Sequence, residues 1–420
     1  MLDRKFIIQN LEMVRDNCAK RRALVDVDSF VRTEKARLNL ERRLQQIQQE
    51  MNRLAKQRSV EAEVDHERAK ELKREARLIK ADLVEVAEKS DILLKQIPNL
   101  THPDSPIGEE ANSQEIYRSK YPKPNFDYAI LDHKDLGEEL GMLDMDSGTK
   151  VAKPGFYFIK GDLALLEIAL MRFALDRVME AGYELLITPD VANDKTMEGT
   201  GYFPRGDESN TFTLGHDGLN LIATSEIVLC GMYADTTINE EDLPVRVAGL
   251  SHCFRTERAA GRATRGLYRV HQFQKVEMVA ICKPEDGERL HNELLAIEKK
   301  IFEDLELPFR IIDIASGDLG APAYRKYDLE AWMPKRGDGG EFGEVTSTSN
   351  CTDYQARRLN IKYKMKDTNK NAFVYTLNGT GLAIGRAMIA LLENNQQLDR
   401  SVRIPKKLQP YFGKETIRAR

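Results

Sequence analysis

Charged and aromatic side chains alternate with apolar ones in residues 244–281, the part of the chain best suited to chemistry. Strand side chains point alternately to two faces, so two strands paired as a hairpin would bring one set of side chains together. That set is Ser251, Cys253, Arg255 and Glu257 on the first strand, and Phe273, Lys275 and Glu277 on the second. Val276, Met278 and Ala280 would form the apolar reverse face.

This set of side chains is typical of a nucleotide-binding surface. An aromatic ring can stack on a base, arginine can neutralise a phosphate, and glutamate can accept a hydrogen bond from an exocyclic amine. The connecting loop, residues 258–266, adds Arg258, Arg262 and Arg265. An ordinary half-exposed sheet with a charged outer face fits the same alternation. A P-loop or Rossmann dinucleotide site is not expected, because the chain has neither GxxxxGK[ST] nor GxGxxG after a predicted strand.

Several segments together resemble class II aminoacyl-tRNA synthetases in their seryl form. The segments that carry the resemblance are 182–189 for motif 1, 254–257 and 272–277 for motif 2, 379–386 for motif 3, and 224–226, 344–347 and 355–358 for the seryl subfamily. The resemblance covers essentially the whole chain. It implies an α+β fold, with an antiparallel β-sheet core flanked by helices, and motif 1 as a dimer-forming element.

The resemblance also implies how ATP is bound. Arg255 would hold the α-phosphate and the serine carboxylate, stabilising the charge that builds during attack. Glu257 would contact adenine, Phe273 would stack on one side of it, and Arg386 would close the other side near the γ-phosphate. Arg255 and Arg386 are therefore the expected catalytic residues. The other residues of the expected ATP site are Thr256, Glu344, Val345, Thr346 and Ser347.

For the metal and the amino acid, the resemblance implies oxygen-rich sites. Glu344 and Ser347 would hold Mg²⁺, a hard cation that takes oxygen ligands. The expected serine-binding residues are Thr224, Ser225, Glu226, Arg255, Glu277 and Thr380. Of these, Thr224 and Glu226 would lie near the amino group, whereas Glu277 and Thr380 would line the site of the hydroxyl. Alanine would be rejected because it leaves those buried polar groups unpaired.

The implied activity is that of a serine–tRNA ligase, which forms seryl-adenylate from ATP and then acylates the 3′ end of tRNA(Ser). The expected partners are ATP, L-serine, tRNA(Ser) and a second copy of the chain, with tRNA(Sec) added if the source makes selenoproteins. Two alternatives are a relative that acylates a carrier protein and a catalytically inactive scaffold. The first would lack the N-terminal arm, and the second would lose Arg255, Glu344 or Arg386. Arg258, Ala263 and Thr380 depart from the common family pattern, and the motif 2 loop is one residue shorter.

The N-terminal region has a different physical character. Residues 1–97 contain no glycine and no proline, so only polar clusters can stop a helix there. Two apolar heptad seams follow one another: Leu40, Leu44, Ile47, Met51, Leu54, and Leu72, Ala76, Ile79, Leu83, Val86, Ser90, Leu93. With the turn at 59–66, they predict an antiparallel two-helix coiled coil, each helix about 45 Å long. We expect residues 1–103 to form a tRNA-binding arm and 104–420 the catalytic domain.

Charge favours an RNA contact on the first of the two helices. Residues 20–58 carry 11 Lys+Arg against 5 Asp+Glu, whereas residues 61–92 carry 7 against 10. A basic helix face suits a phosphate backbone. A solvated coiled coil used for dimerisation or spacing explains the same charges. The net charge of −4 excludes a uniformly basic nucleic-acid binder, so the contact must be local.

Prolines at 98, 103 and 106 end the helical region. Beyond it, a helix is predicted from Asp162 as N-cap to Gly182 just past its end, with strands at 244–247, 268–281 and 309–314. No apolar run of about 18 residues is present, so no membrane span is expected. The five cysteines form no CxxC pair, so we expect free thiols, no zinc and a cytoplasmic location.

Overall fold

The computed structural model describes residues 1–419 except 57–61, 203–209, 216 and 258–264. The chain divides into two compact units, Met1–Leu100 and Thr101–Arg420. Arg258, Arg262 and Ala263, which the sequence singled out, lie outside the described residues.

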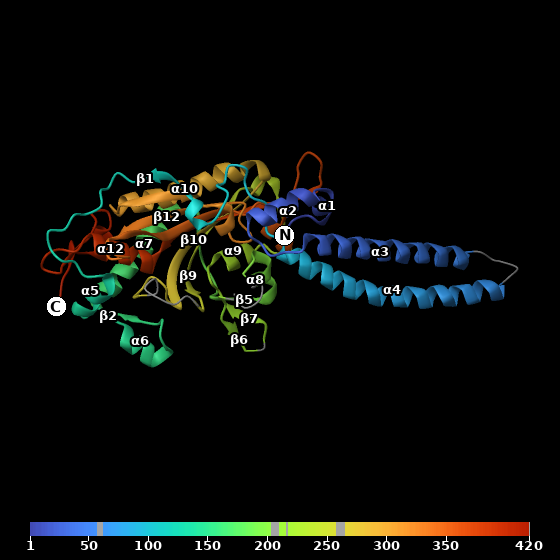
Figure 1. Ribbon diagram of the computed structural model, residues 1–420, viewed down its shortest axis with the longest axis horizontal. Helices are drawn as coiled ribbons and strands as arrows, with labels where there is room; N and C mark the ends of the chain where they lie inside the picture. The colour runs from blue at the N-terminus through green and yellow to red at the C-terminus, as the bar shows by residue number, and fades with distance from the viewer. Residues whose placement is uncertain (57–61, 203–209, 216, 258–264, 420) are drawn as a thin grey trace. The chain divides into compact units, whose positions relative to one another are not determined.

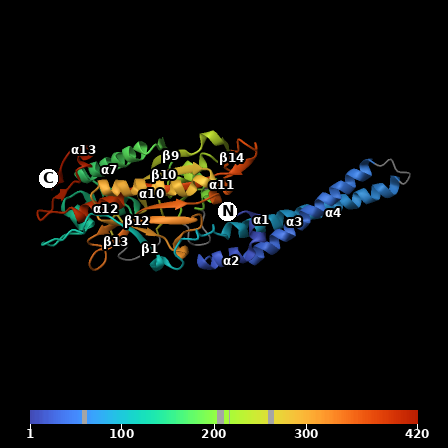
Figure 2. The ribbon, with the colours of Figure 1, turned by 90° about the horizontal axis from the view of Figure 1, so that it is seen from above.

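Two long helices dominate the N-terminal unit. Short helices α1 (Arg4–Gln9) and α2 (Leu11–Lys20) precede α3 (Val27–Lys56) and α4 (Ala62–Gln96). Figures 1 and 2 show α3 and α4 side by side along their lengths. Their seam buries Ile47, Leu72 and Ile79, and five further heptad residues pack against these while partly buried, which confirms the coiled coil: Leu40, Leu44, Met51, Leu54 and Ala76. The predicted turn is only partly correct: residues 62–66 already belong to α4, and 59–61 lie outside the described residues.

A buried carboxylate crosses the seam near the end of the unit where the chain begins. Glu34 is almost fully buried, yet its side chain pairs with Arg4 at 2.6 Å and with Arg37 at 2.7 Å. The Ser90 hydroxyl donates to it at 2.7 Å, which explains a serine within an apolar heptad. Because a buried charge is tolerated only when it is paired, Glu34 helps to fix the register of the two helices.

An eight-stranded sheet forms the centre of the second unit. Its strands, in spatial order, are β1 (Gln114–Arg118), β11 (Phe309–Asp313), β12 (Arg325–Met333), β13 (Glu341–Asn350), β16 (Tyr375–Ala383), β10 (Gln272–Cys282), β9 (Val245–Phe254) and β4 (Glu184–Ile187). All neighbours are antiparallel except β4 and β9. The predicted antiparallel core is therefore confirmed. The strand predicted at 268–281 begins only at Gln272, and the one at 244–247 continues to Phe254.

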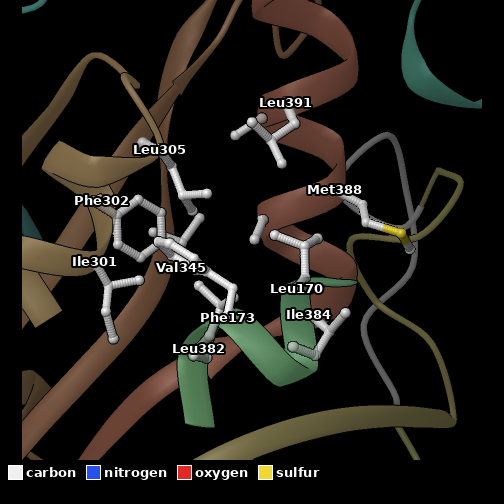
Figure 3. Packing of buried hydrophobic residues seen from close by; sticks show 14 of the residues in the cluster. Leu170, Phe173, Ile301, Phe302, Leu305, Val345, Leu382, Ile384, Met388 and Leu391 are labelled. Carbon is white, nitrogen blue, oxygen red and sulfur yellow. The ribbon is translucent and has the colours of Figure 1, made fainter. Parts of the chain in front are cut away.

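Three helices cover one face of the sheet and share a single core with it. They are α7 (Gly161–Glu180), α10 (Gly287–Asp304) and α12 (Ile384–Asn394). Figure 3 shows side chains of all three helices meeting those of the sheet. Val276 and Met278 of β10 are fully buried in this core, as the alternation predicted.

The ends of α7 test the capping predictions. Gly182 follows the helix with φ +85°, a left-handed conformation that glycine adopts without strain, as predicted. The prediction of Asp162 as N-cap is wrong, because Lys160 holds that position and Asp162 lies in the first turn. Its carboxylate pairs with Lys414 at 2.6 Å instead and also suits the positive helix end.

The opposite face of the sheet carries helices toward one end of β10 and a cleft toward the other. Helices α8 (Asp194–Thr200), α9 (Glu226–Gly231) and α11 (Tyr354–Leu359) adjoin its second apolar cluster, which contains Val279 and Ile281 of β10. Toward the other end of β10, the same face carries Phe273, Lys275 and Glu277, and there a cleft remains open. One strand thus supplies both an apolar floor under the helices and a polar floor under the cleft.

Shorter elements complete the second unit. The remaining helices and strands are α5 (His133–Glu139), α6 (Met145–Ala152), α13 (Gln409–Phe412), β2 (Leu143–Asp144), β3 (Phe158–Ile159), β5 (Val191–Asn193), β6 (Thr213–Leu214), β7 (Leu219–Leu221), β8 (Thr237–Asn239), β14 (Lys362–Lys364), β15 (Asn371–Phe373), β17 (Val402–Arg403) and β18 (Thr416–Ile417). None of the helices in the described part of the chain combines the length and apolar character needed to cross a bilayer.

Candidate active site

The hairpin of β9 and β10 forms the floor of the candidate site. In its register, Phe273 pairs with Cys253, Lys275 with Ser251, and Glu277 with Gly249. Alternation had placed Arg255 and Glu257 within the first strand. β9 ends at Phe254, however, so both residues lie just beyond it. Glu257 has φ +30°, and this turn still directs it to the cleft.

A cleft of about 390 Å³ collects most of the predicted residues. Those lining it are Glu226, Arg255, Glu257, Phe273, Glu277, Glu344, Val345, Thr346, Ser347, Thr380 and Arg386. Thr224, Ser225 and Thr256 are not part of its lining. Thr224 and Ser225 are fully buried, and the Thr224 hydroxyl accepts from the Glu226 amide at 3.2 Å. They support Glu226 from behind.

A β-bulge brings Glu344 and Ser347 to the same cleft. Residues three apart on a regular strand face opposite sides. In β13, however, Leu329 of β12 pairs with Thr346 and Glu330 pairs with Glu344, so Val345 is an extra residue. The shift lets Glu344 and Ser347 both line the cleft although they are three positions apart in the chain.

Arg386 and Glu344 form a charged pair in the cleft. The Arg386 guanidinium donates to the Glu344 carbonyl at 3.0 Å and lies 3.3 Å from its carboxylate. Burial alone would raise the pKa of Glu344, but Arg386, Lys326 and Arg255 together lower that pKa to about 2. The carboxylate is thus ionised at neutral pH. On the hairpin, Arg255 lies over the Phe273 ring, 5.2 Å from its centroid.

A hydrogen-bonded group of side chains surrounds Glu226 at the other side of the cleft. Gln355 and Asn378 donate to one carboxylate oxygen at 2.7 and 2.8 Å, and Tyr202 donates to the other at 2.7 Å. Burial and the nearby Glu277 raise the pKa of Glu226. Glu277 pairs with Lys275, and so two buried carboxylates face one small space with a cation beside them.

The site also contains residues that the sequence did not single out as ligands. Tyr202, Tyr268, Lys326 and Asn378 line the cleft, and Gln355 orients Glu226. Each of these types is common in structural roles, and none stands at a diagnostic spacing. The signals that could have found two of them are positional: Gln355 opens a segment of the seryl resemblance, and Asn378 directly precedes Gly379 of motif 3.

The candidate metal ligands in the cleft are few, and their donor atoms are oxygens. Among the described residues, no group of three or more His, Cys, Asp or Glu side chains is arranged to hold a metal. Glu344 offers a carboxylate and Ser347 a hydroxyl, beside Asp328, which pairs with Ser347 across β12 and β13. One buried Asp328 oxygen has no hydrogen-bond partner in the described structure. This donor set fits Mg²⁺, which takes one or two carboxylates and completes its shell with phosphates and water.

Comparisons with known proteins agree over the whole chain. Residues 1–101 match the Seryl-tRNA synthetase N-terminal domain, and residues 212–395 match the tRNA synthetase class II core domain (G, H, P, S and T). The chain is 46% identical to a serine–tRNA ligase of Rhodopirellula baltica, covering 100% of both chains, and 48% identical to that of Rubrobacter xylanophilus, covering 99% of both.

Solved structures give the same result. A seryl-tRNA synthetase from Pyrococcus horikoshii complexed with ATP superposes with a TM-score of 0.92 at 33% identity, covering 100% of each chain. A cytoplasmic serine–tRNA ligase from Naegleria fowleri in complex with AMP gives 0.86 at 29% identity, covering 98% of this chain and 96% of that one. With these relatives matched from end to end and the motif residues gathered in one cleft, the chain belongs to the seryl-tRNA synthetases, within the class II aminoacyl-tRNA synthetase family.

Proposed function

We propose that this chain esterifies serine to tRNA(Ser) in two steps at the cleft described above. In the first, a serine carboxylate oxygen bonds to the α-phosphorus of ATP while the bond to the β-phosphate oxygen breaks, releasing pyrophosphate. In the second, a terminal ribose hydroxyl of the tRNA attacks the carbonyl of seryl-adenylate, and AMP leaves. Most of the rate enhancement would come from positioning and electrostatics, without an enzyme nucleophile.

The ATP-binding roles follow from the positions of the charged and aromatic groups. Arg255 would hold the α-phosphate and the serine carboxylate, and Phe273, already in contact with Arg255, would stack on adenine. Glu257 would accept from the adenine amine. Arg386 would lie near the γ-phosphate, held in place by Glu344. Thr256 is a weaker candidate, because it does not line the cleft.

Mg²⁺ would be held by Glu344 and Ser347, which fit it in ligand chemistry. When bound, the cation would neutralise phosphate charge during the displacement. The Glu344 carboxylate is ionised because of the three cations near it, so it can serve as a ligand without first losing a proton. Val345 and Thr346 lie between the two ligands in the chain, and the Thr346 hydroxyl donates to buried Glu298 at 2.8 Å.

Serine would occupy the space between Glu226 and Glu277. The substrate ammonium group would compensate the Glu226 carboxylate, which Tyr202, Gln355 and Asn378 hold in place. The substrate hydroxyl would meet Glu277 and Thr380. Thr224 and Ser225 would act indirectly, since both lie buried behind Glu226.

The tRNA would bind along α3. Four cations of this helix are exposed and have no ion-pair partner among the described residues: Lys35, Arg42, Arg53 and Lys56. Their spacings of 7, 11 and 3 residues place them on one side of a helix. Such a row can follow a phosphate backbone and does not read bases. Selenocysteine tRNA would be a second substrate wherever the source makes selenoproteins.

A homodimer would form through β4 and α7. β4 is an edge strand, and Ile187 at its end is 96% exposed. On α7, Ile168 is 59% and Leu165 is 47% exposed. An edge strand beside exposed large apolar side chains is a surface that a second copy can cover. The five cysteines are free and buried, which supports a cytoplasmic location.

Serine-dependent exchange of label between pyrophosphate and ATP, measured with each of the twenty amino acids, tests this function. Exchange with serine far above that with any other amino acid, followed by serylation of tRNA(Ser), is the expected result. Exchange without tRNA acylation would favour a relative that acylates a carrier protein, and no exchange would favour an inactive scaffold. The observation that carries the proposal is the cleft that unites Arg255, Phe273, Glu344 and Arg386.

A further inference from the structure

A second cleft adjoins the nucleotide cleft, and the Tyr268 ring lines both. The second cleft has a volume of about 600 Å³. Its cationic residues are Arg265, Lys335 and Arg336, the last two from the turn between β12 and β13. Nothing in the two-step reaction outlined above uses this space.

Two guanidinium groups contact the same tyrosine. Arg386, which lines the nucleotide cleft, lies 4.6 Å from the centroid of the Tyr268 ring, and Arg336, which lines the second cleft, lies 4.1 Å from it. The Tyr268 hydroxyl donates to the Glu344 carbonyl at 3.2 Å, which fixes the ring. Two cations on one ring repel each other, and the carboxylates beside them are Glu344, 3.3 Å from Arg386, and Glu341, 3.6 Å from Arg336.

Arg336 has unused hydrogen-bonding capacity. Its buried Nε has no hydrogen-bond partner in the described structure, and the nearest carboxylate oxygen, from Glu341, is 3.6 Å away. The buried Nε of Arg269, which belongs to the same group of cations around Tyr268, is also without a partner there. Unpaired buried donors are costly, so their presence points to a ligand.

One buried carboxylate holds the backbone on both sides of this arrangement. Glu393 accepts from His133 Nδ1 at 2.8 Å, and His133 Nε2 accepts from the Leu267 amide at 3.1 Å. The other Glu393 oxygen accepts from the Lys335 amide at 3.0 Å. Leu267 precedes Tyr268 and Lys335 precedes Arg336, so a single side chain fixes the positions from which both residues extend.

The second cleft is lined by three basic side chains, Arg265, Lys335 and Arg336, and by four carboxylates, Asp132, Asp135, Glu341 and Glu393. Arg265 is paired with Asp132 at 2.8 Å and Asp135 at 2.6 Å, and Glu393 is occupied as described. Lys335 has no ion-pair partner among the described residues, and Arg336 has only the distant Glu341. An anion reaching this space would therefore meet Lys335, which has no carboxylate partner among the described residues, and Arg336, whose contact with Glu341 is long.

We propose that Arg336 binds the β,γ-phosphate end of ATP together with Arg386, and that the second cleft is the path by which pyrophosphate leaves. This inference rests on the proposed function. As the bond between the α-phosphorus and the bridging oxygen breaks, its electron pair goes to pyrophosphate. The added negative charge arises next to Tyr268, where Arg386 and Arg336 neutralise it from two sides.

The test compares the wild type with Arg336→Gln. A charge-assisted hydrogen bond is lost, so KM for ATP and KM for pyrophosphate in the exchange reaction should each rise about tenfold. KM for serine and the Kd of a sulfamoyl analogue of seryl-adenylate, which carries no pyrophosphate, should not change. Arg289→Gln removes a guanidinium from the exposed surface of α10 and is the matched control. Arg336→Lys should recover most of the lost pyrophosphate affinity.

Three results would overturn the inference. In the first, affinity for the adenylate analogue falls together with that for ATP, which would mean a general structural role. In the second, ATP and pyrophosphate constants stay as in the wild type. In the third, only KM for tRNA rises, which would assign the second cleft to the acceptor end. A wild type that shows no serine-dependent exchange would instead refute the proposed function, so the two failures are distinguishable.

Discussion

The hydroxyl of Thr380 donates to the carboxylate of Glu277 at 3.5 Å, across strands β16 and β10. The two residues are paired in register only because the ladder shifts there: Val276 pairs with Leu382 and Glu277 with Thr380, so Gly381 is an extra residue. This bulge turns Thr380 toward the cleft and places a hydroxyl beside a buried carboxylate. The pair is therefore a strong candidate for distinguishing serine from alanine.

Thr380→Val should weaken that distinction. The substitution keeps the shape of the side chain but removes one hydrogen-bonding group, so KM for serine should rise about tenfold. Alanine has no hydroxyl to lose, and its KM should stay nearly constant. Pyrophosphate exchange with both amino acids measures the ratio. Thr380→Ser retains the hydroxyl and should retain discrimination; equal loss in both variants would contradict a role for the hydroxyl.

Neutralising the basic face of α3 should weaken tRNA binding without affecting serine activation. In the variant Lys35→Gln, Arg42→Gln, Arg53→Gln, Lys56→Gln, KM for tRNA should rise at least tenfold, because each lost phosphate contact removes counterion release. The slope of log affinity against log salt should become shallower by about 3. Pyrophosphate exchange should equal that of the wild type.

The control for this variant lies on the partner helix. Changing Lys73, Arg74, Arg77 and Lys80 of α4 to glutamine removes the same formal charge from exposed positions. If both variants lose tRNA affinity equally, net charge and not the α3 face is responsible. If neither loses affinity, the arm does not bind tRNA through these cations.

His291 on α10 should make the catalytic unit sensitive to mild acid. Burial lowers the pKa of His291 to about 4, and its Nε2 donates to the Thr348 carbonyl at 3.1 Å. The unfolded chain binds this proton near pH 6.5, so stability rises with pH between about 4 and 6.5. At pH 5 the protein should be less stable than at pH 7.5 by about 2 kcal/mol from this group alone.

His291→Gln should remove that part of the acid sensitivity. The free energy of unfolding can be followed by fluorescence of Trp332, the single tryptophan, which lies on β12. The difference between pH 7.5 and pH 5 should shrink by about 2 kcal/mol in the variant. An unchanged difference would mean that His291 is protonated in the folded state.

Ile187→Asp should separate the proposed homodimer. A charge at the end of edge strand β4 would be buried without a partner when two copies associate. We expect the wild type to sediment as a dimer and the variant as a monomer at the same concentration. Ile116→Asp, on edge strand β1 at the opposite side of the sheet, is the matched control because Ile116 is 50% exposed. Dissociation caused by Ile116→Asp alone would place the interface at the β1 edge and contradict the proposed interface at β4.

The regular spacing of apolar and polar residues along the chain predicted the regular parts of the fold. Heptad spacing predicted the coiled coil, and strand alternation predicted which side of β10 carries Phe273 and Glu277 and which carries Val276. Alternation did not predict where β9 ends, so Arg255 was expected inside a strand that stops one residue earlier. The start of α7 was also missed, because the prediction looked for a capping side chain. Lys160 takes the cap position although its side chain makes no cap hydrogen bond, so the helix begins before Asp162.

The irregular parts of the site could not be derived from any period. Glu344 and Ser347 face one cleft because Val345 is a bulge, and Thr380 faces it because Gly381 is one. A bulge adds a residue to one strand only, so it appears in the pairing of two strands and not in the sequence of either. The family resemblance named these residues, but it gave no physical reason why they meet. Tyr268 and Arg336 belong to no repeating pattern of apolar and polar residues and to no motif segment, so nothing in the sequence marked them.

The N-terminal unit has two apolar clusters that share no residue. One, around Phe30 and Leu94, unites the ends of α3 and α4 with the short helices, and the other, around Ile47 and Leu72, lies farther along the seam. Insertion or removal of seven residues in each long helix, between the clusters, leaves both sets of contacts intact. The reach of this unit can thus change in steps of about 10 Å. Related chains could fit transfer RNAs of different dimensions in this way while the cleft that performs the chemistry stays the same.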